Sequence, residues 1–245
     1  MKREFLIFLP TYNESGYIKT IINKIRFKYP EIDVLVINDG STDDTKYIID
    51  HIPEIYVINH TTNKGYGYSL IEGFKYAVKW QYRYLITIDG DLQHDPEEIK
   101  AFIRATSYTD ADIISGSRLL HTTNKQLQDI PNIRYRINQR ITRYINRLTN
   151  HSITDAFCGF KLYKVSALSD LNLTETGYGF PLQFWFEADR RGLGVKEIPV
   201  KLIYNDYSRN FKEKFDSALK RYKYYITIIQ KELHAYEYHD YSSAS

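Results

Sequence analysis

LITIDGDLQHDP, residues 85–96, sets an apolar run directly against a cluster of acidic residues. The run Leu85–Ile88 has the composition of a buried strand, and it is followed by Asp89 and, after one glycine, by Asp91. Two carboxylates so close together repel each other. A tight turn at the end of a strand is one interpretation of Asp-Gly-Asp. A site for Mg²⁺ or Mn²⁺ is the other, because these ions bind carboxylate oxygens and would relieve the repulsion.

Two further nucleotide- and metal-binding signals near this stretch are weaker. His94 is a candidate third ligand of the ion, although a surface histidine with no metal role is the simpler interpretation. The segment GYGYSL (65–70) begins like GxGxxG but lacks the third glycine, and the sequence contains no Walker A motif. Neither a dinucleotide-binding fold nor a P-loop enzyme is supported.

The first half of the chain alternates β-like segments with helix-like ones. The β-like segments are continuous apolar runs, which favours a mostly parallel sheet covered by helices on both faces. We expect strands at residues 4–9, 33–38, 55–59, 84–89 and 111–117. We expect helices from a cap at Asn13 or Ser15 to about residue 29, over 43–51 and 69–80, and from Pro96.

Three polar clusters, at residues 11–14, 39–43 and 89–94, each come directly after an expected strand. The carboxyl ends of parallel strands meet at one edge of a sheet, and ligands of open α/β sheets bind outside that edge. The sequence therefore predicts an active site there.

The second half is less regular. Helices are expected over 131–150 and 180–192, the latter closed by Gly192, with a short strand inside 153–165 and another over 195–204. An amphipathic helix over 212–235 and a frayed tail complete the chain.

The composition fits one large α/β domain of 245 residues with a net charge of +3, too small to indicate a nucleic-acid partner. The single cysteine, Cys158, excludes an intrachain disulfide and a cysteine-based zinc site, and it suits a reducing compartment. Neither a signal peptide nor an apolar run of about 18 residues is visible. We therefore expect a cytoplasmic protein, with a peripheral contact at the cytoplasmic membrane face as an additional hypothesis.

One expected helix carries a row of arginines. Arg136, Arg140, Arg143 and Arg147 are spaced by four, three and four residues, which places them on one helical face. A solvated face is one interpretation. Contact with a lipid phosphate or an anionic membrane surface is the other.

Six motifs together resemble the family 2 glycosyltransferases. They occur in the family's order: LPTYNE (9–14), VINDGSTDDT (36–45), NKGYG (63–67), DGDLQHDPEEI (89–99), GSR (116–118) and DAFCGFKLY (155–163). The chain is most similar to the polyprenyl-phosphate sugar synthases of the dolichyl-phosphate mannose synthase type, over residues 5 to about 203. The resemblance implies a Rossmann-like GT-A fold over residues 1–210, followed by a C-terminal amphipathic helix and tail over 211–245. It also implies a GDP- or UDP-sugar donor, Mg²⁺ or Mn²⁺, and inversion of the anomeric centre.

The same resemblance implies roles for individual residues. Asp89 and Asp91 would hold the metal, with Asp91 the principal ligand. Arg118 would face the phosphates, and Gln93 would approach the sugar or the acceptor phosphate. The donor pocket would be lined by Pro10, Tyr12, Glu14, Asp39 at the base or ribose, and Lys64.

This sequence departs from the family's pattern at two places. The common Asp-Asp-Gly-Ser begins here with Asn38, and the Gly-x-Ser-Lys segment of lipid-phosphate synthases is replaced by a stretch in which Arg209 and Lys212 are the candidate phosphate contacts.

The acceptor decides the remaining chemistry. A phosphate monoester is already largely ionised at pH 7 and needs no general base, whereas a hydroxyl does. Asp155, in the presumed acceptor stretch, is the candidate base in the second case, and a turn or helix cap is its structural alternative. We expect transfer of a hexose to polyprenyl phosphate. The alternatives are transfer to a hydroxyl of a glycan or protein, a non-catalytic sugar-nucleotide-binding module, and a nucleotidyltransferase.

Overall fold

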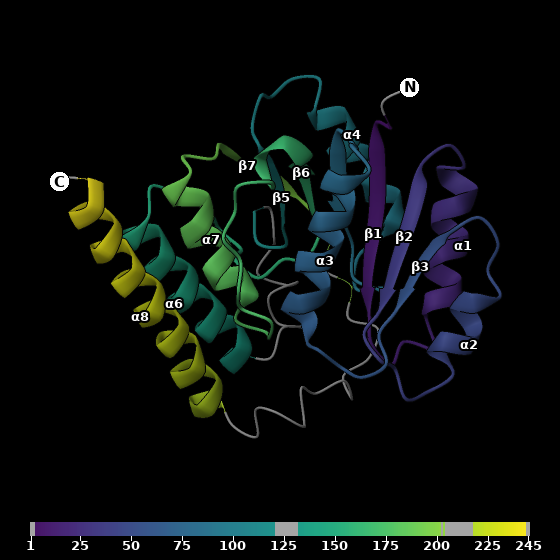
Figure 1. Ribbon diagram of the computed structural model, residues 1–245, viewed down its shortest axis with the longest axis horizontal. Helices are drawn as coiled ribbons and strands as arrows, with labels where there is room; N and C mark the ends of the chain where they lie inside the picture. Colours follow the sequence, from purple (N-terminus) through teal and green to yellow (C-terminus); the bar gives the residue numbers. More distant parts are fainter. Residues whose placement is uncertain (1–2, 121–131, 202, 204–217, 244–245) are drawn as a thin grey trace.

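The computed structural model describes residues 3–120, 132–201, 203 and 218–243. One seven-stranded sheet, in the order β3-β2-β1-β4-β6-β5-β7, forms its centre (Figure 1). The strands are β1 (Phe5–Thr11), β2 (Asp33–Asn38), β3 (Tyr56–Asn59), β4 (Tyr84–Thr87), β5 (Ile113–Ser117), β6 (Lys161–Lys164) and β7 (Val195–Pro199).

Both faces of the sheet are buried, as the continuous apolar runs predict. In β1, Leu6 and Phe8 enter one hydrophobic cluster, whereas Ile7 and Leu9 enter the other on the opposite face. Successive strand residues point to opposite faces, so a strand covered on both sides must be apolar throughout.

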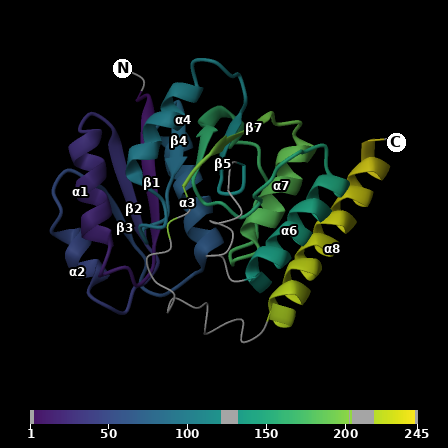
Figure 2. The same ribbon diagram turned by 180° about the vertical axis from the view of Figure 1, so that it is seen from behind.

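The helices divide between these two faces. Helices α1 (Ile18–Lys28), α2 (Thr45–Asp50) and α4 (Ile99–Ala105) contribute to one cluster. Helices α3 (Tyr66–Lys79), α6 (Asn132–Leu148), α7 (Phe180–Arg190) and α8 (Ala218–Ser243) contribute to the other. Figures 1 and 2 show α6, α7 and α8 stacked side by side at the β5–β7 end of the sheet. This is the expected α/β GT-A architecture.

Strand β6 breaks the parallel pattern. It runs antiparallel between β4 and β5, with Thr87 opposite Lys161 and Ser115 also opposite Lys161. The sequence indicated a short strand here but not its direction, because orientation depends on the path of the preceding loop. The consequence is functional: the chain before β6 arrives at the edge where β4 ends.

Three local predictions were wrong. Neither Asn13 nor Ser15 caps α1, which begins after Tyr17 without a side-chain cap. β4 ends at Thr87, two residues before Asp89. The chain end expected to fray is helical as far as Ser243, while the predicted boundary at residue 210 lies outside the described residues.

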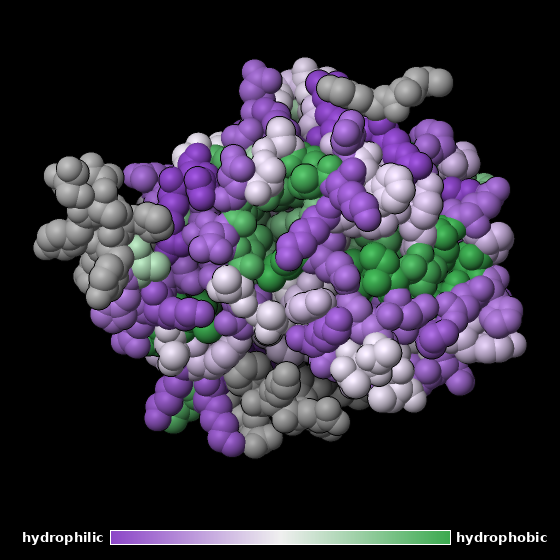
Figure 3. Space-filling model, viewed as in Figure 1, coloured by the Kyte–Doolittle hydropathy of each residue, from purple (hydrophilic) through white to green (hydrophobic). Residues whose placement is uncertain are grey.

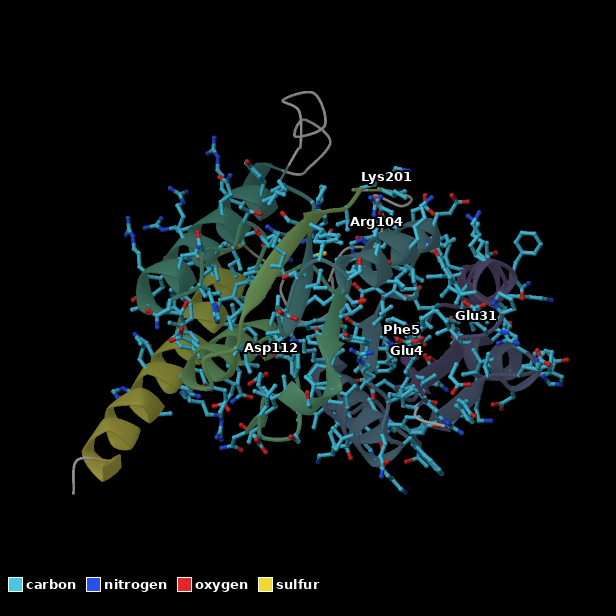
Figure 4. All side chains as sticks on the ribbon, turned by 90° about the horizontal axis from the view of Figure 1, so that it is seen from above. Glu4, Phe5, Glu31, Arg104, Asp112 and Lys201 are labelled. Carbon is cyan, nitrogen blue, oxygen red and sulfur yellow. The ribbon has the colours of Figure 1, made fainter. Side chains whose placement is uncertain are left out.

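The faces of the molecule differ in character. Apolar side chains gather over β2 and β3 beside α3 (Figure 3). Tyr56 on β3 and Trp80 after α3 are exposed, and the Arg3 guanidinium lies over both rings. Figure 4 views the edge where the parallel strands begin, marked by Glu4 and Phe5 at β1 and by Asp112 before β5. The predicted active site lies at the opposite edge.

Candidate active site

The predicted site residues follow three strands, β1, β2 and β4, at the edge of the sheet where these strands end. β1 pairs in parallel with β2 and with β4, so the segments after Thr11, Asn38 and Thr87 leave the sheet together. Tyr12 comes directly after β1, Asp39 directly after β2, and Asp89 two residues after β4. The three polar clusters of the sequence therefore meet, as predicted.

Two of these clusters bind each other. The side-chain oxygens of Ser41, Thr45 and Asp43 accept the backbone N–H groups of residues 13, 14 and 15, at 2.9, 2.7 and 3.2 Å. Asn13, which has a φ of 55°, also accepts the backbone N–H of Thr42 through its own side chain. Asn13 and Ser15, which resemble helix caps in the sequence, thus form hydrogen bonds that hold the loop after β1.

Asp39 is buried and holds the glycine loop that begins α3. Its two oxygens accept the backbone N–H groups of Lys64 and Gly65, each at 2.8 Å. His60 Nδ1 lies 2.7 Å from the same carboxylate, and its Nε2 lies 2.5 Å from Glu72. The shape of the 60–65 loop therefore depends on one carboxylate after β2.

The hydrogen bonds of Asn38 explain why an amide stands where the family commonly has an aspartate. Its side-chain amide donates to Asn59 Oδ1 at 2.8 Å, and its Oδ1 accepts the backbone N–H of Ser41 at 3.1 Å. A carboxylate at this position could not donate to Asn59.

Two tyrosines that the sequence did not single out complete the wall around the acidic pair. Tyr66 donates to Asp89 Oδ1 at 3.3 Å, and Tyr178 stacks on Tyr66 with ring centroids 6.1 Å apart. Burial and then the nearby Tyr12, Asp39 and Asp89 raise the pKa of Tyr178. Tyr178 therefore lies near residues that follow all three strands. A lone tyrosine before α7 carries no sequence signal of this kind.

The charge of Asp89 is offset only in part, because burial and Asp91 outweigh the effects of Tyr66, Arg118 and Lys161 on its pKa. Burial, and then the negative charge of Asp91, raise the pKa of Asp89. Asp91 accepts the backbone N–H of Gln93 at 3.0 Å, and this contact shapes the turn. In the described part of the chain, no cluster of three or more His, Cys, Asp or Glu residues is arranged to hold a metal ion.

Gly159, just before β6, lies against Asp89. A Cβ atom at Gly159 would stand 2.4 Å from Asp89 Oδ2, closer than atoms can approach. The segment that leads into β6 thus places the backbone of residue 159 against the Asp89 carboxylate. Only glycine, which has no Cβ atom, fits at this position.

Arg118 and Asp155 form a bidentate ion pair near the acidic pair. Arg118 Nε donates to Asp155 Oδ2 at 2.6 Å, and Nη2 donates to Oδ1 at 2.9 Å. Asp155 is only 2% exposed. Burial by itself raises the pKa of this carboxyl, but the Arg118 charge and hydrogen bonds outweigh it and hold the pKa below its usual value.

Two buried groups lie near the pair: Lys161, which the sequence did not single out, and His94, whose burial it did not predict. Lys161 on β6 donates its ammonium to the Cys158 carbonyl, and burial lowers its pKa. His94 is buried rather than at the surface: its Nε2 lies 3.9 Å from Cys158 Sγ, its Nδ1 has no hydrogen-bond partner among the described residues, and burial lowers its pKa to about 3. The simpler sequence interpretation of His94 was therefore wrong.

The remaining predicted residues are placed as follows. Pro10 lies inside β1 opposite Ile37 and is buried. Tyr12 is 38% exposed and Glu14 is half-buried. Lys64 is exposed, with its ammonium 4.6 Å from the centre of the Tyr68 ring. Arg209 and Lys212 lie outside the described residues.

The chain belongs to the glycosyl transferase family 2, whose model matches residues 6–171. It is therefore a family 2 glycosyltransferase enzyme, as the motifs predict.

Relatives agree with this membership, and a solved structure has a similar fold. The chain is 30% identical to the undecaprenyl-phosphate mannosyltransferase of Micrococcus luteus, over 81% of this chain and 83% of that protein. It is 26% identical to the UDP-N-acetylglucosamine–dolichyl-phosphate N-acetylglucosaminyltransferase of Methanococcus voltae, over 82% and 86%. The fold is similar to that of Mycobacterium tuberculosis glucosyl-3-phosphoglycerate synthase in complex with Mn²⁺, UDP and phosphoglyceric acid. The TM-score is 0.71 and the identity 16%, over 94% of this chain and 78% of that one.

Proposed function

We propose that the enzyme transfers a hexose from a nucleotide-diphosphate sugar to the phosphate of a polyprenyl phosphate, with inversion of the anomeric centre. The observation that carries the acceptor class is the Arg118–Asp155 pair. Asp155 is buried, has a lowered pKa, and presents both oxygens to Arg118. Such a carboxylate is a poor general base, and a phosphate acceptor is the kind that needs none. The two relatives above are named for undecaprenyl phosphate and for dolichyl phosphate, and both compounds are polyprenyl phosphates.

Asp91 and Asp89 would hold a Mg²⁺ or Mn²⁺ ion. The donor set fits, because burial and the Asp91 charge raise the pKa of Asp89, and such ions take the rest of their ligands from water and substrate phosphates. When bound, the ion would supply positive charge to the leaving diphosphate. The solved protein of similar fold was crystallised with Mn²⁺ and UDP, which supports this assignment.

The chain's own residues would bind and orient the two substrates. Arg118 would face the phosphates, and Asp155 would fix the plane of its guanidinium. Pro10, Tyr12, Glu14 and Lys64 would line the donor pocket. Asp39 would act on the nucleotide through the 63–65 loop, because its oxygens already accept backbone N–H groups there. Gln93 would approach the sugar or the acceptor phosphate.

Gly159→Ala provides a test of the Asp89 site that does not depend on the acceptor. The added methyl would force Asp89 or the β6 entry to move, at a cost of about 1–3 kcal/mol of stability. We expect Mn²⁺ affinity, measured by titration calorimetry, to fall about tenfold or more. Gly194→Ala is the matched control, because its Cβ would make only ordinary contacts of 3.6 Å and beyond. Equal Mn²⁺ affinity in the two variants would contradict the placement of Asp89 at the metal.

The acceptor is tested with two lipids that share a chain. Undecaprenyl phosphate and undecaprenol are offered with labelled UDP- and GDP-sugars in the presence of Mn²⁺. We expect transfer to the phosphate and none to the alcohol, with an α-linked donor giving a β-linked product by NMR. Transfer to undecaprenol or to a glycan at a similar rate would instead establish the hydroxyl alternative. Release of pyrophosphate from UTP or GTP with a sugar 1-phosphate, in a separate assay, would indicate a nucleotidyltransferase, and donor binding without transfer a binding module.

A peripheral membrane contact follows from the proposed acceptor, since its polyprenyl chain lies in the bilayer. Within the residues that the structure describes, no helix has both the length and the apolar character needed to cross a membrane. The enzyme would therefore reach its acceptor from the membrane surface. A location at the cytoplasmic face stays a prediction.

A further inference from the structure

Helix α6 has two opposite faces of contrasting chemistry. Ile137, Ile141 and Ile145 are buried in the hydrophobic cluster that α6 shares with α7 and α8. The predicted arginine row lies on the other side, where Arg136, Arg140, Arg143 and Arg147 are exposed. The sequence of α6 contains five arginines and no acidic residue.

Helix α8 turns this row into a groove. Arg140, Arg143, Tyr144 and Arg147 of α6 line a cavity of about 500 Å³ with Tyr222 and Ile226 of α8; we call this the α6–α8 groove. The Arg140 guanidinium lies 5.4 Å from the centre of the Tyr222 ring. Figure 2 shows the two helices side by side along their length. The groove thus has cationic walls with an aromatic and aliphatic flank.

The positive charge of the groove is concentrated on one face of α6. Among the described residues, no carboxylate forms an ion pair with Arg140, Arg143 or Arg147. Arg136 is the fourth exposed arginine on this side of α6. These basic residues alone exceed the net charge of +3 of the whole chain, so the rest of the surface is acidic by comparison. An ordinary solvated face would mix both signs.

We propose that the α6–α8 groove binds the anionic headgroups of a phospholipid membrane and docks the enzyme on the bilayer. Guanidinium groups pair with phosphate through two N–H donors at once, and a tyrosine beside them suits the interface between headgroups and acyl chains. Figure 1 shows α8 starting on the side of the molecule where β1 ends, which is the side of the active site. The inference deepens the proposed function by naming the surface through which a membrane-bound acceptor is approached.

Vesicle flotation of the full chain tests this surface without donor, acceptor or turnover. We expect binding to vesicles of phosphatidylcholine mixed with phosphatidylglycerol, and little binding to phosphatidylcholine alone. The triple variant Arg140→Glu, Arg143→Glu, Arg147→Glu is expected to lose about 100-fold in affinity, at roughly fivefold for each basic residue removed from an anionic surface. The triple variant Arg140→Gln, Arg143→Gln, Arg147→Gln serves the same purpose if charge reversal impairs folding.

The control reverses the same number of charges elsewhere. Lys19, Lys24 and Lys75 are exposed on α1 and α3, and their change to glutamate should leave vesicle binding within about twofold. An equal loss in the control would show that net charge, and not this groove, drives binding, and would overturn the proposal. Equal binding of wild type to both kinds of vesicle would overturn it as well.

A further arm separates headgroups from free phosphate. Inorganic phosphate at the total lipid-phosphate concentration should compete weakly with vesicles, and full competition would contradict docking on a bilayer. Failure of the proposed transfer reaction is distinguishable, because it would leave vesicle binding intact. Failure of docking would leave transfer to a detergent-dispersed acceptor intact.

Discussion

Asp91→Asn is expected to lower the turnover of sugar transfer by about 10²–10³-fold while the protein stays folded. The amide has nearly the shape of the carboxylate, and its oxygen can still accept the backbone N–H of Gln93, so the turn after β4 should persist. What is lost is a negative charge at the place where a divalent ion would be held. We expect the Mn²⁺-dependent rise in melting temperature with UDP- or GDP-sugars to disappear in the same variant.

The matched control is Asp95→Asn in the same loop. Asp95 accepts the backbone N–H of Glu97 at 3.1 Å as the cap of the short helix Pro96–Glu98, and asparagine caps equally well. Its contact with Lys201 is 3.5 Å long and exposed, so little stability depends on it. Turnover should stay within about twofold of wild type. Wild-type turnover in Asp91→Asn at the same Mn²⁺ concentration would refute the metal assignment.

Local pattern was sufficient for most of the fold and for the position of the site. The apolar runs located the strands to within a few residues, because a strand that is covered on both faces must be apolar along its whole length. The placement of Tyr12, Asp39 and Asp89 at one edge followed from parallel pairing alone. Both inferences need only periodicity and topology, which a sequence carries directly.

What the sequence could not supply were contacts between distant segments. Asn13 resembles a helix cap, yet its side chain accepts from Thr42, on a loop brought close only by folding. His94 resembles a surface residue, but the antiparallel entry of β6 covers it with Cys158 and Phe160. A polar side chain can form a local hydrogen bond or one with a distant segment. The sequence does not show which of the two forms, because the distant partner comes close only in the folded protein.

Asp155 shows how such a contact changes a chemical role. The sequence allowed a general base or a structural cap at this position. The structure places Arg118 on both of its oxygens, and Oδ1 also accepts the backbone N–H of Phe157, as a turn cap does. The pair also predicts a large stability effect.

Arg118→Met is expected to destabilise the protein by about 3–5 kcal/mol at pH 7, because it leaves the buried Asp155 carboxylate without its counter-charge. In wild type the lowered pKa of Asp155 means that its stabilising contribution is present above the unfolded pKa of about 4, and is lost as pH falls through the folded pKa. In the variant, burial without Arg118 should raise that pKa. The difference in unfolding free energy should therefore be largest at neutral pH and shrink toward pH 4. Urea unfolding at several pH values measures it.

A double-mutant cycle with Asp155→Asn isolates the pair. Asp155→Asn removes the buried charge and leaves Arg118, whose side chain is 20% exposed and reaches water, so it should cost less than Arg118→Met. The double variant should be more stable than Arg118→Met alone, because no uncompensated buried charge remains. Lys28→Met is the reference for an exposed pair, since Lys28 and Glu97 lie 3.5 Å apart at the surface, and it should cost about 1 kcal/mol or less. Additive losses in the cycle would show that the pair is not coupled.

The Asp155→Asn variant also separates the two acceptor classes. If the acceptor is a phosphate, Asp155 only orients Arg118, and the variant should keep a measurable fraction of turnover with an unchanged acidic limb in its pH–rate profile. If the acceptor is a hydroxyl, Asp155 is the base, and both turnover and that limb should vanish together. The pH profile distinguishes the two because a purely structural loss lowers the whole curve without moving its inflection.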